Sequence, residues 1–472
     1  MSLSFKAAPR LGGVIRPQPH PHFRSFSAVH FSGNRDTGIQ AAPWRSSRGP
    51  LHFDRFRSPP GVVYVPARTF IKEREKPTGS LTRSPPFAFA FDIDGVLLHV
   101  AKPIPGAAET LKFLQDNGIP YILLTNGGGK HERDRVADLS KRLGVHLSVD
   151  NFVQSHTPFQ ELVHAYWTES DVHGHKQTEL REGDKTSGLA NKNILITGSD
   201  ASKSRQIAEA YGFRSVITPA DILAAHPTIF PFEPLLESHY AATARPLPSS
   251  SPKIDAIFVY NDPRDWALDT QIILDLLLSE RGVLGTYSTK NGRAEHANHG
   301  WQQDEQPHLF FSNHDLFWSA SYHLPRFGQG AFQAALAGMW REITGGKAEL
   351  IRTTIGKPYS RTYSYAEKVL GQWRADLLKG DVGGGGGKGA DEAPDTEPAP
   401  LARVYMVGDN PESDIRGANE YVSPQGTEWA SVLVRTGVWN KDRDGEPRHK
   451  PHAIADDVAG AVEWALKREG WR

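Results

Sequence analysis

Apolar runs and amphipathic segments alternate along the chain from about residue 87 onward. The run FAFAF (87–91) is apolar throughout, as a buried strand would be, and GAAETLKFLQDNG (106–118) has helical spacing and ends at a glycine. A second strand is predicted over IPYILLTN (119–126) and a second helix over KHERDRVADLSKRLG (130–144). Strands separated by helices of about 10–15 residues favour parallel pairing, so the pattern predicts a doubly wound, Rossmann-like α/β sheet.

The same order of elements returns late in the chain. ARVYMVGDN (402–410) predicts a strand that runs into a turn, IRGANEY (415–421) begins a helix, and WASVLVRTG (429–437) predicts a further strand. Residues 166–329 have strand and helix signals of their own, and within them the charged, glycine-containing stretch 169–192 predicts a loop. We therefore predict a core formed by residues 87–165 and 330–472, into which residues 166–329 are inserted as a second α/β domain.

Three further segments have the composition of irregular chain. Residues 1–50 carry seven lysines or arginines and a single acid, which is typical of an organellar transit peptide; a basic tail without a targeting role is the alternative. Residues 51–86 contain repeated prolines and predict a linker, so we expect folded structure to begin near residue 87. Residues 379–400 include five consecutive glycines and then acidic, proline-containing sequence, which predicts a disordered insertion within the core.

The bulk composition narrows the classes of function. Lysine plus arginine equals aspartate plus glutamate at 54 each, so no global charge attracts the protein to nucleic acid, and we expect no nucleic-acid partner. Cysteine is absent, which removes disulfides, cysteine-containing zinc sites and thiol nucleophiles. Apolar runs are all shorter than about 18 residues, so we predict no transmembrane span.

Two aspartates follow the first predicted strand, one residue apart. Residues i and i+2 of an extended strand share a face, so Asp92 and Asp94 are predicted to point the same way from the carboxyl end of that strand. Open α/β sheets bind ligands beyond such ends, and Gly95 lets the backbone turn away there. Adjacent carboxylates are tolerated when a cation neutralises them, and oxygen ligands suit Mg²⁺. An ordinary turn is the alternative, because Asp-x-Asp-Gly is common in turns.

Polar residues also follow three later strands. Thr125 and Asn126 precede a run of glycines whose N–H groups can cradle an anion, although a plain glycine turn is the alternative. Lys357 lies between glycine and proline, where it can neutralise a carboxylate and a phosphoryl oxygen; isolated lysines are more often solvated. Asp409 ends a strand, and Asp414 follows five residues later beside a helix start, where an N-cap is the alternative.

Taken together, these strand ends resemble the four motifs of the haloacid dehalogenase (HAD) superfamily. The four stretches are FDIDGVL (91–97), LLTNGG (123–128), IGKP (355–358) and GDNPESDIRGAN (408–419). A cap between the second and third motifs resembles the subclass that includes phosphoglycolate and p-nitrophenyl phosphatases. Within that subclass, QSHTPF, DPRDW and LPRFGQGAF resemble the cat eye syndrome critical region-like mitochondrial branch. The resemblance implies a HAD core with an inserted α/β cap domain.

The resemblance also implies a role for each polar side chain. Asp92 would be the nucleophile that forms an aspartyl-phosphate, and Asp94 would protonate the leaving oxygen and then activate water. Mg²⁺ would bind the carboxylate of Asp92, the backbone carbonyl of Asp94 and the carboxylate of Asp409, with Asp414 in support. The phosphoryl oxygens would be held by Thr125, Asn126 and Lys357.

The implied activity is Mg²⁺-dependent hydrolysis of a small phosphorylated metabolite in mitochondria, in the matrix. Asp94 favours phosphoryl chemistry, because dehalogenases of the superfamily lack this acid. A low-turnover phospho-ligand-binding or scaffold protein is the alternative, and a role in glycerophospholipid biosynthesis ranks below both. A homodimer is one of the states that the sequence permits. The inserted domain would close over the site, and NDPRDW provides either contacts there or a capped turn, through Asp262, Arg264, Asp265 and Trp266.

Overall fold

The computed structural model describes residues 62–65, 84–172, 175–182, 188–318, 320, 322, 324–382 and 399–471. All of them belong to one compact unit, Arg57–Arg472. The predicted transit peptide, most of the predicted linker and residues 383–398 of the predicted insertion lie outside the described residues. Among the described helices, none is long and apolar enough to cross a membrane.

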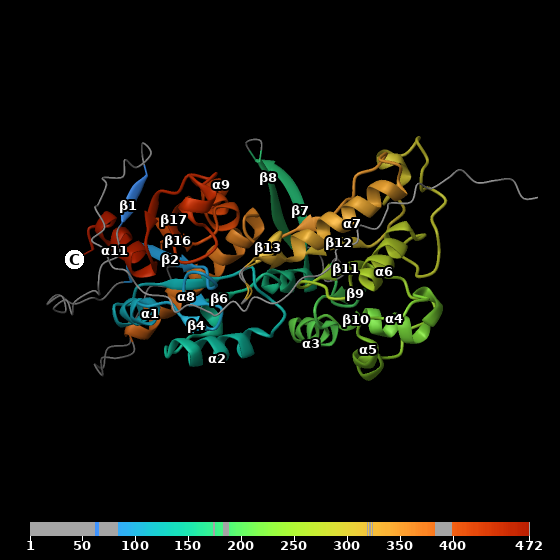
Figure 1. Cartoon of the computed structure of the whole chain (residues 1–472), viewed down its shortest axis with the longest axis horizontal. Coiled ribbons are helices and arrows are strands. Elements are labelled where there is room, and N and C mark those ends of the chain that lie inside the picture. The colour runs from blue at the N-terminus through green and yellow to red at the C-terminus, as the bar shows by residue number, and fades with distance from the viewer. Residues whose placement is uncertain are drawn as a thin grey trace, which may run out of the picture. The chain divides into compact units, whose positions relative to one another are not determined.

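A seven-stranded parallel sheet forms the centre of the core domain (Figure 1). Its two central strands pair in a fixed register, with Phe87 opposite Arg403 and Phe91 opposite Val407, so both strands end at the same edge of the sheet. The prediction of a doubly wound parallel sheet is confirmed. In spatial order the strands are β1 (Val63–Val65), β18 (Ala453–Ala455), β17 (Glu428–Val434), β16 (Arg403–Gly408), β2 (Phe87–Phe91), β5 (Tyr121–Leu124) and β6 (Phe152–Val153).

The central strand β2 separates the two faces of this sheet by side-chain size. Phe87, Phe89 and Phe91 pack into one apolar cluster, whereas Ala88 and Ala90 belong to the cluster on the opposite face. Because the alternation has period two, large rings fill one side and small methyl groups let a helix approach on the other. Helices α1 (Ala107–Asp116), α2 (Glu132–Leu143) and α11 (Val458–Arg468) cover the phenylalanine face, and α8 (Ser360–Val382) and α9 (Arg416–Glu420) cover the alanine face.

A second, five-stranded parallel sheet is inserted between β6 and α8. Its strands are β10 (Ser215–Ile217), β9 (Asn193–Thr197), β11 (Ala256–Val259), β12 (His308–Phe311) and β15 (Thr353–Thr354), in spatial order. The prediction of an inserted α/β cap is confirmed. Its helices are α3 (Ala201–Tyr211), α4 (Pro219–Ala225), α5 (Glu237–Thr243), α6 (Trp266–Leu278) and α7 (Gln329–Ile343).

The boundaries predicted for the cap are too narrow at both ends. Phe332 and Trp340 of α7, which we assigned to the core, pack with the apolar cluster of the second sheet. Phe159, in the short helix Thr157–Val163, also packs against strands of that sheet. Helical periodicity shows that α7 has an apolar face, but it does not say which of two similar sheets that face covers.

Two predictions of irregular structure are wrong. Within the predicted linker, Val63–Val65 forms the edge strand β1, and the neighbouring Val62 is buried with Trp439 and Ile454. The predicted loop 169–192 contains most of an antiparallel hairpin, β7 (Ala165–Val172) with β8 (His175–Glu182). A three-residue strand among prolines and a polar hairpin both lack the apolar pattern from which strands are predicted.

The remaining described elements are short. They are the hairpins β3 (Leu98–His99) with β4 (Lys102–Pro103) and β13 (Phe317–Trp318) with β14 (Arg326–Phe327), the helices Val149–Asn151, Pro227–Ile229, Ala297–Gly300 and Pro411–Ile415, and α10 (Lys441–Asp444).

A buried polar cluster joins α2 of the core to α3 of the cap. The ring of His156 stacks on Tyr260 with centroids 5.1 Å apart, and its Nδ1 lies 2.9 Å from the hydroxyl of Tyr211. Glu132 accepts hydrogen bonds from the hydroxyls of Tyr211 and Thr157. Burial lowers the pKa of His156 to about 4, although the Glu132 carboxylate opposes that shift. His156 is therefore neutral in the folded protein at neutral pH.

This cluster predicts a loss of stability in mild acid. The unfolded imidazole takes up its proton near pH 6.5, whereas the buried ring does so only near about 4, so the unfolded state binds more protons between these values. We expect the free energy of unfolding to fall by roughly 1–3 kcal/mol from pH 6.5 to 4 through this group. In urea unfolding, His156→Gln should show a shallower pH dependence, and His164→Gln, which changes an exposed histidine, should keep the wild-type slope. Equal slopes for all three proteins would refute the assignment.

Candidate active site

The first carboxylate of the site stands directly after the central strand. Strand β2 ends at Phe91, and the Asp92 N–H donates to the carbonyl of Val407 at 2.9 Å, which places the buried Asp92 side chain at the sheet edge. The chain then turns at Gly95, whose φ is 94°. A Cβ on Gly95 would lie 2.3 Å from an oxygen of Asp409, so the close approach of this turn requires glycine.

Two further carboxylates come from the end of the neighbouring strand β16. The Asp409 carboxylate accepts a hydrogen bond from the Val438 N–H at 2.6 Å, and Asp414 accepts one from the Asn410 N–H at 3.1 Å. Asn410 is the residue that caps the following helical turn, so Asp414 is not the N-cap. Carboxylate oxygens of Asp92, Asp409 and Asp414 lie within 4.8 Å of one another, and all three residues are buried.

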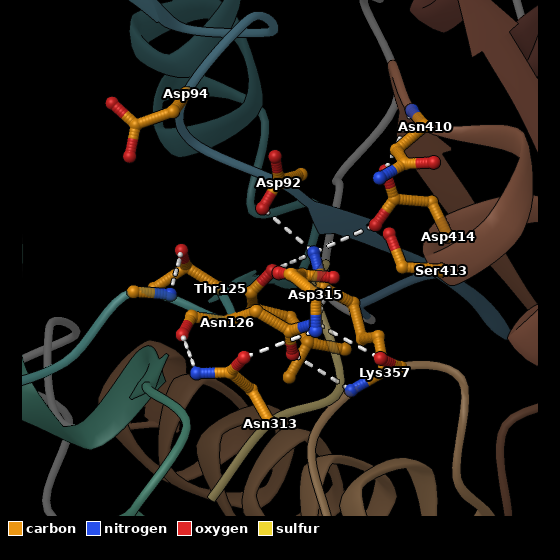
Figure 2. A network of polar contacts seen from close by, with 12 residues as sticks. Asp92, Asp94, Thr125, Asn126, Asn313, Asp315, Lys357, Asn410, Ser413 and Asp414 are labelled. Carbon is orange, nitrogen blue, oxygen red and sulfur yellow. Dashed lines mark hydrogen bonds and ion pairs between the residues drawn. The ribbon is translucent and has the colours of Figure 1, made fainter. Parts of the chain in front are cut away.

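Lys357 supplies a positive charge to this cluster (Figure 2). Its Nζ lies 2.6 Å from Asp92 Oδ1 and 2.7 Å from Asp414 Oδ1, and it donates to the carbonyl of Leu124 at 2.8 Å. Burial by itself lowers the pKa of Lys357, but the carboxylates of Asp414 and Asp92 outweigh it and raise that pKa. Lys357 is thus a buried, charged residue rather than a solvated one.

The three carboxylates carry more negative charge than one lysine balances. Burial raises the pKa of Asp92 to about 7, with Lys357 opposing and Asp414 adding to the shift. Burial and then the charge of Asp92 raise the pKa of Asp409. Three converging oxygen donors with this excess charge fit a small divalent cation such as Mg²⁺.

Asn126 connects the lysine to the cap. Its Oδ1 accepts the Lys357 N–H at 2.7 Å, and its Nδ2 donates to the Lys357 carbonyl at 2.9 Å and to Asp315 Oδ1 at 3.1 Å (Figure 2). The side-chain amide that we predicted to hold a phosphoryl oxygen is therefore engaged within the protein. Thr125 lies beside it, buried, and its hydroxyl oxygen accepts the Gly127 N–H at 3.0 Å.

Asp94 lies apart from the other carboxylates. Its side chain is 52% exposed, points away from Asp92 in Figure 2, and has Arg135 at 3.6 Å. The prediction that Asp92 and Asp94 share a face is wrong, because the extended strand ends at Phe91 and the turn rotates the next residues. Asp94 nevertheless borders the same cavity as Asp92.

Sequence reasoning missed two site residues that the cap contributes. They follow strand β12 in the stretch SNHD: Asn313 Nδ2 donates to the Asn126 carbonyl at 3.3 Å, and Asp315 accepts from the Asn126 amide. Burial raises the pKa of Asp315 to about 7, with the hydrogen bond from Asn126 opposing. The available signal was the same as at Asp92, an apolar strand that ends in polar residues.

These residues surround a cavity of about 1040 Å³ lined by both the core and the cap. The sequence left two alternatives for the NDPRDW stretch, contacts at the site or a capped turn, and different residues of the stretch fit each of them. Asp262 and Arg264 line the cavity, whereas Asp265 caps helix α6 by accepting the Leu268 N–H at 3.2 Å. Trp266 packs edge-on against Phe332, away from the lining.

Two protein-family models match this chain. Residues 89–214 match the family model described as haloacid dehalogenase-like hydrolase, and residues 354–461 match the model described as HAD-hydrolase-like. The matched ranges contain the four site carboxylates of the core, Asp92, Asp94, Asp409 and Asp414. They also contain Thr125, Asn126 and Lys357.

The matched relatives include two fungal proteins. The chain is 39% identical over 393 residues to the mitochondrial hydrolase YKR070W of Saccharomyces cerevisiae, covering 82% of this chain and 97% of that protein. It is 39% identical over 399 residues to a cardiolipin synthase (CMP-forming) / mitochondrial hydrolase fusion protein of Schizosaccharomyces pombe, covering 84% of this chain but only 56% of the fusion protein.

Among solved structures, a p-nitrophenyl phosphatase from Archaeoglobus fulgidus is 16% identical with a TM-score of 0.47, covering 81% of this chain and 99% of that chain. NagD from Escherichia coli is 19% identical with a TM-score of 0.42, covering 80% of this chain and 98% of that one. The family-model matches and the near-complete alignment with the yeast hydrolase establish that the chain belongs to the haloacid dehalogenase-like hydrolase family.

Proposed function

We propose that the protein is a Mg²⁺-dependent phosphatase that hydrolyses a small phosphomonoester through an aspartyl-phosphate on Asp92. The observation that carries this proposal is the cluster of Asp92, Asp409, Asp414 and Lys357 in the lining of the cavity. Lys357 contacts Oδ1 of Asp92, while Oδ2 accepts no hydrogen bond among the described residues. One oxygen is thus oriented by a cation and the other is available to attack phosphorus.

Asp92, Asp409 and Asp414 would hold the metal ion. When bound, Mg²⁺ would neutralise charge on the phosphoryl group and shield the anionic nucleophile from it. Lys357 would neutralise part of the same charge. Asn126 would act as a positioning residue, because its amide fixes both backbone groups of Lys357.

Asp94 would move the proton. An oxygen of Asp92 forms a bond to phosphorus as the ester P–O bond breaks, and Asp94 gives its proton to the departing alkoxide. Asp94 then takes a proton from the water that cleaves the aspartyl-phosphate, which restores both carboxyl groups and releases phosphate. Asp94 borders the cavity but points away from Asp92 and toward Arg135, so this role requires its side chain to turn toward Asp92 when substrate binds.

The nucleophile assignment predicts the largest loss of activity. With p-nitrophenyl phosphate and Mg²⁺, Asp92→Asn should lower kcat on the order of 10³-fold or more, because an amide cannot form the acyl-phosphate bond. Chelation should abolish wild-type turnover, and Asp409→Asn should raise the Mg²⁺ concentration needed for half-maximal rate.

Asp138→Asn is the matched control, since Asp138 is a carboxylate of α2 that pairs with Arg142 at 2.9 Å outside the cavity lining. It should retain the wild-type rate and Mg²⁺ requirement. Full activity of Asp92→Asn would sink the nucleophile assignment. Tight vanadate binding without phosphate release over a broad panel of phosphomonoesters would instead identify a phospho-ligand-binding protein.

The positioning role of Asn126 predicts a different kinetic result. Asn126→Ala leaves the backbone groups of Lys357 and an oxygen of Asp315 without the partner that Asn126 provides, so the lysine should lose its fixed position. We expect kcat to fall on the order of 10–100-fold while KM changes little. Asn117→Ala, which removes one hydrogen bond to the Phe113 carbonyl at the end of α1, should leave kcat unchanged. An unaltered kcat in Asn126→Ala would contradict the role.

We also propose that the protein acts in mitochondria, in the matrix. The support is the basic, acid-poor composition of residues 1–50 and the word mitochondrial in the names of both fungal relatives. Residues 1–60 fused to a fluorescent reporter should direct it to the mitochondria of yeast cells, and a reporter lacking them should stay diffuse. A diffuse signal from the fusion itself would overturn the localisation.

A further inference from the structure

The β13–β14 hairpin of the cap presents aromatic side chains to solvent. Phe317, Trp318 and Phe327 are 46%, 41% and 62% exposed, although aromatic residues of this size are usually buried. The rings of Phe317 and Phe327 stack with centroids 5.7 Å apart, and the Trp318 indole N–H donates to the Phe327 carbonyl at 3.1 Å. The exposed rings are thus held in a defined arrangement.

The hairpin is also tied at its base to the active site. It begins two residues after Asp315, which accepts a hydrogen bond from Asn126. It closes through hydrogen bonds of the Gly328 and Gly330 N–H groups to the carbonyls of Leu316 and Asp315, each 2.9 Å. Phe317 and Trp318 line the same cavity as Asp92 and Lys357. A ligand that fills this cavity from the carboxylate cluster outward therefore meets two aromatic rings.

The charge of the cavity does not favour a second anionic group on that ligand. Eight aspartates and four lysines or arginines line it. Apart from Asp92, Asp409, Asp414 and Lys357, five aspartates and three cations remain. Those cations have acidic neighbours: Lys203 lies 3.1 Å from Asp200, Lys130 lies 3.7 Å from Asp138, and the charge of Arg264 acts on Asp262. Asp94, one of the five aspartates, lies 3.6 Å from Arg135 and would carry the proton that the reaction needs, and burial raises the pKa of Asp315 to about 7. Among the described residues, the part of the cavity beyond the carboxylate cluster therefore has no excess of positive charge, and it has an aromatic wall.

We infer that the substrate is a phosphomonoester whose leaving group is uncharged and apolar, either alkyl or aryl, and that this group packs on Phe317 and Trp318. The inference rests on the proposed phosphatase function. The phosphoryl group lies at Asp92 and Lys357, and removal of the apolar group from water against the two rings supplies affinity.

The test compares ethyl, hexyl and benzyl phosphate, which are alcohol-derived esters of the same charge. In the presence of Mg²⁺, hexyl or benzyl phosphate should have a kcat/KM on the order of ten-fold or more above ethyl phosphate, because more apolar surface leaves water. Phe317→Ser and Trp318→Ser should each bring that ratio several-fold closer to one. Because both kcat/KM values of a ratio are measured on the same variant, differences between variants in the fraction of active protein cancel.

Phe232→Ser is the control, since Phe232 is 70% exposed and lies outside the cavity lining. It should keep the wild-type ratio. A preference for hexyl phosphate alone identifies an alkyl group, and a preference for benzyl phosphate alone identifies an aryl group. Equal kcat/KM for all three esters, or a ratio that both hairpin variants leave unchanged, would overturn the inference while the phosphatase proposal stands. If the protein hydrolyses neither these three esters nor p-nitrophenyl phosphate, the inference and the phosphatase proposal are both overturned.

Discussion

The ammonium group of Lys357 lies between Asp92 and Asp414, and the burial of these carboxylates depends on it. Isolated buried carboxylates would take up protons, and burial raises the pKa values of Asp92 and Asp409 even with the lysine present. The lysine enters where the chain returns from the cap to the core, between β15 and α8. Charge balance at the end of the core sheet is thus provided by the segment that connects the two sheets.

The side chains around Lys357 that line the cavity also form hydrogen bonds with one another. Asn126 fixes the backbone of Lys357, and Asp315 and Asn313 fix Asn126 from the cap. A charged group held from two sides keeps its position when solvent enters or leaves the cavity, because reorganisation of the site is already restricted. The cost is a set of buried polar atoms that must all remain paired.

Features of the fold and the site that depend on neighbouring residues in the sequence could be predicted, whereas features that depend on contacts between distant parts of the chain could not. The sheet edge at Asp92 and Asp409 follows from short apolar runs that end in polar residues, and period-two alternation in β2 predicts its two faces. The direction of Asp94 depends on where the strand stops, and a difference of one residue reverses the face. The roles of Asn313 and Asp315, and the packing of Phe332 and Trp340 on the second sheet, depend on contacts across the chain that periodicity does not encode.

The contact between Asn126 and Asp315 has a consequence for how the two domains can change in evolution. A cap inserted into a loop could in principle be exchanged as a module, provided its ends match. Here the core residue that orients Lys357 has its own partner inside the cap, so an exchange that discards the SNHD loop also removes part of the core's polar network. An exchange that preserves this network must therefore keep the SNHD loop and the Asn126 that it contacts.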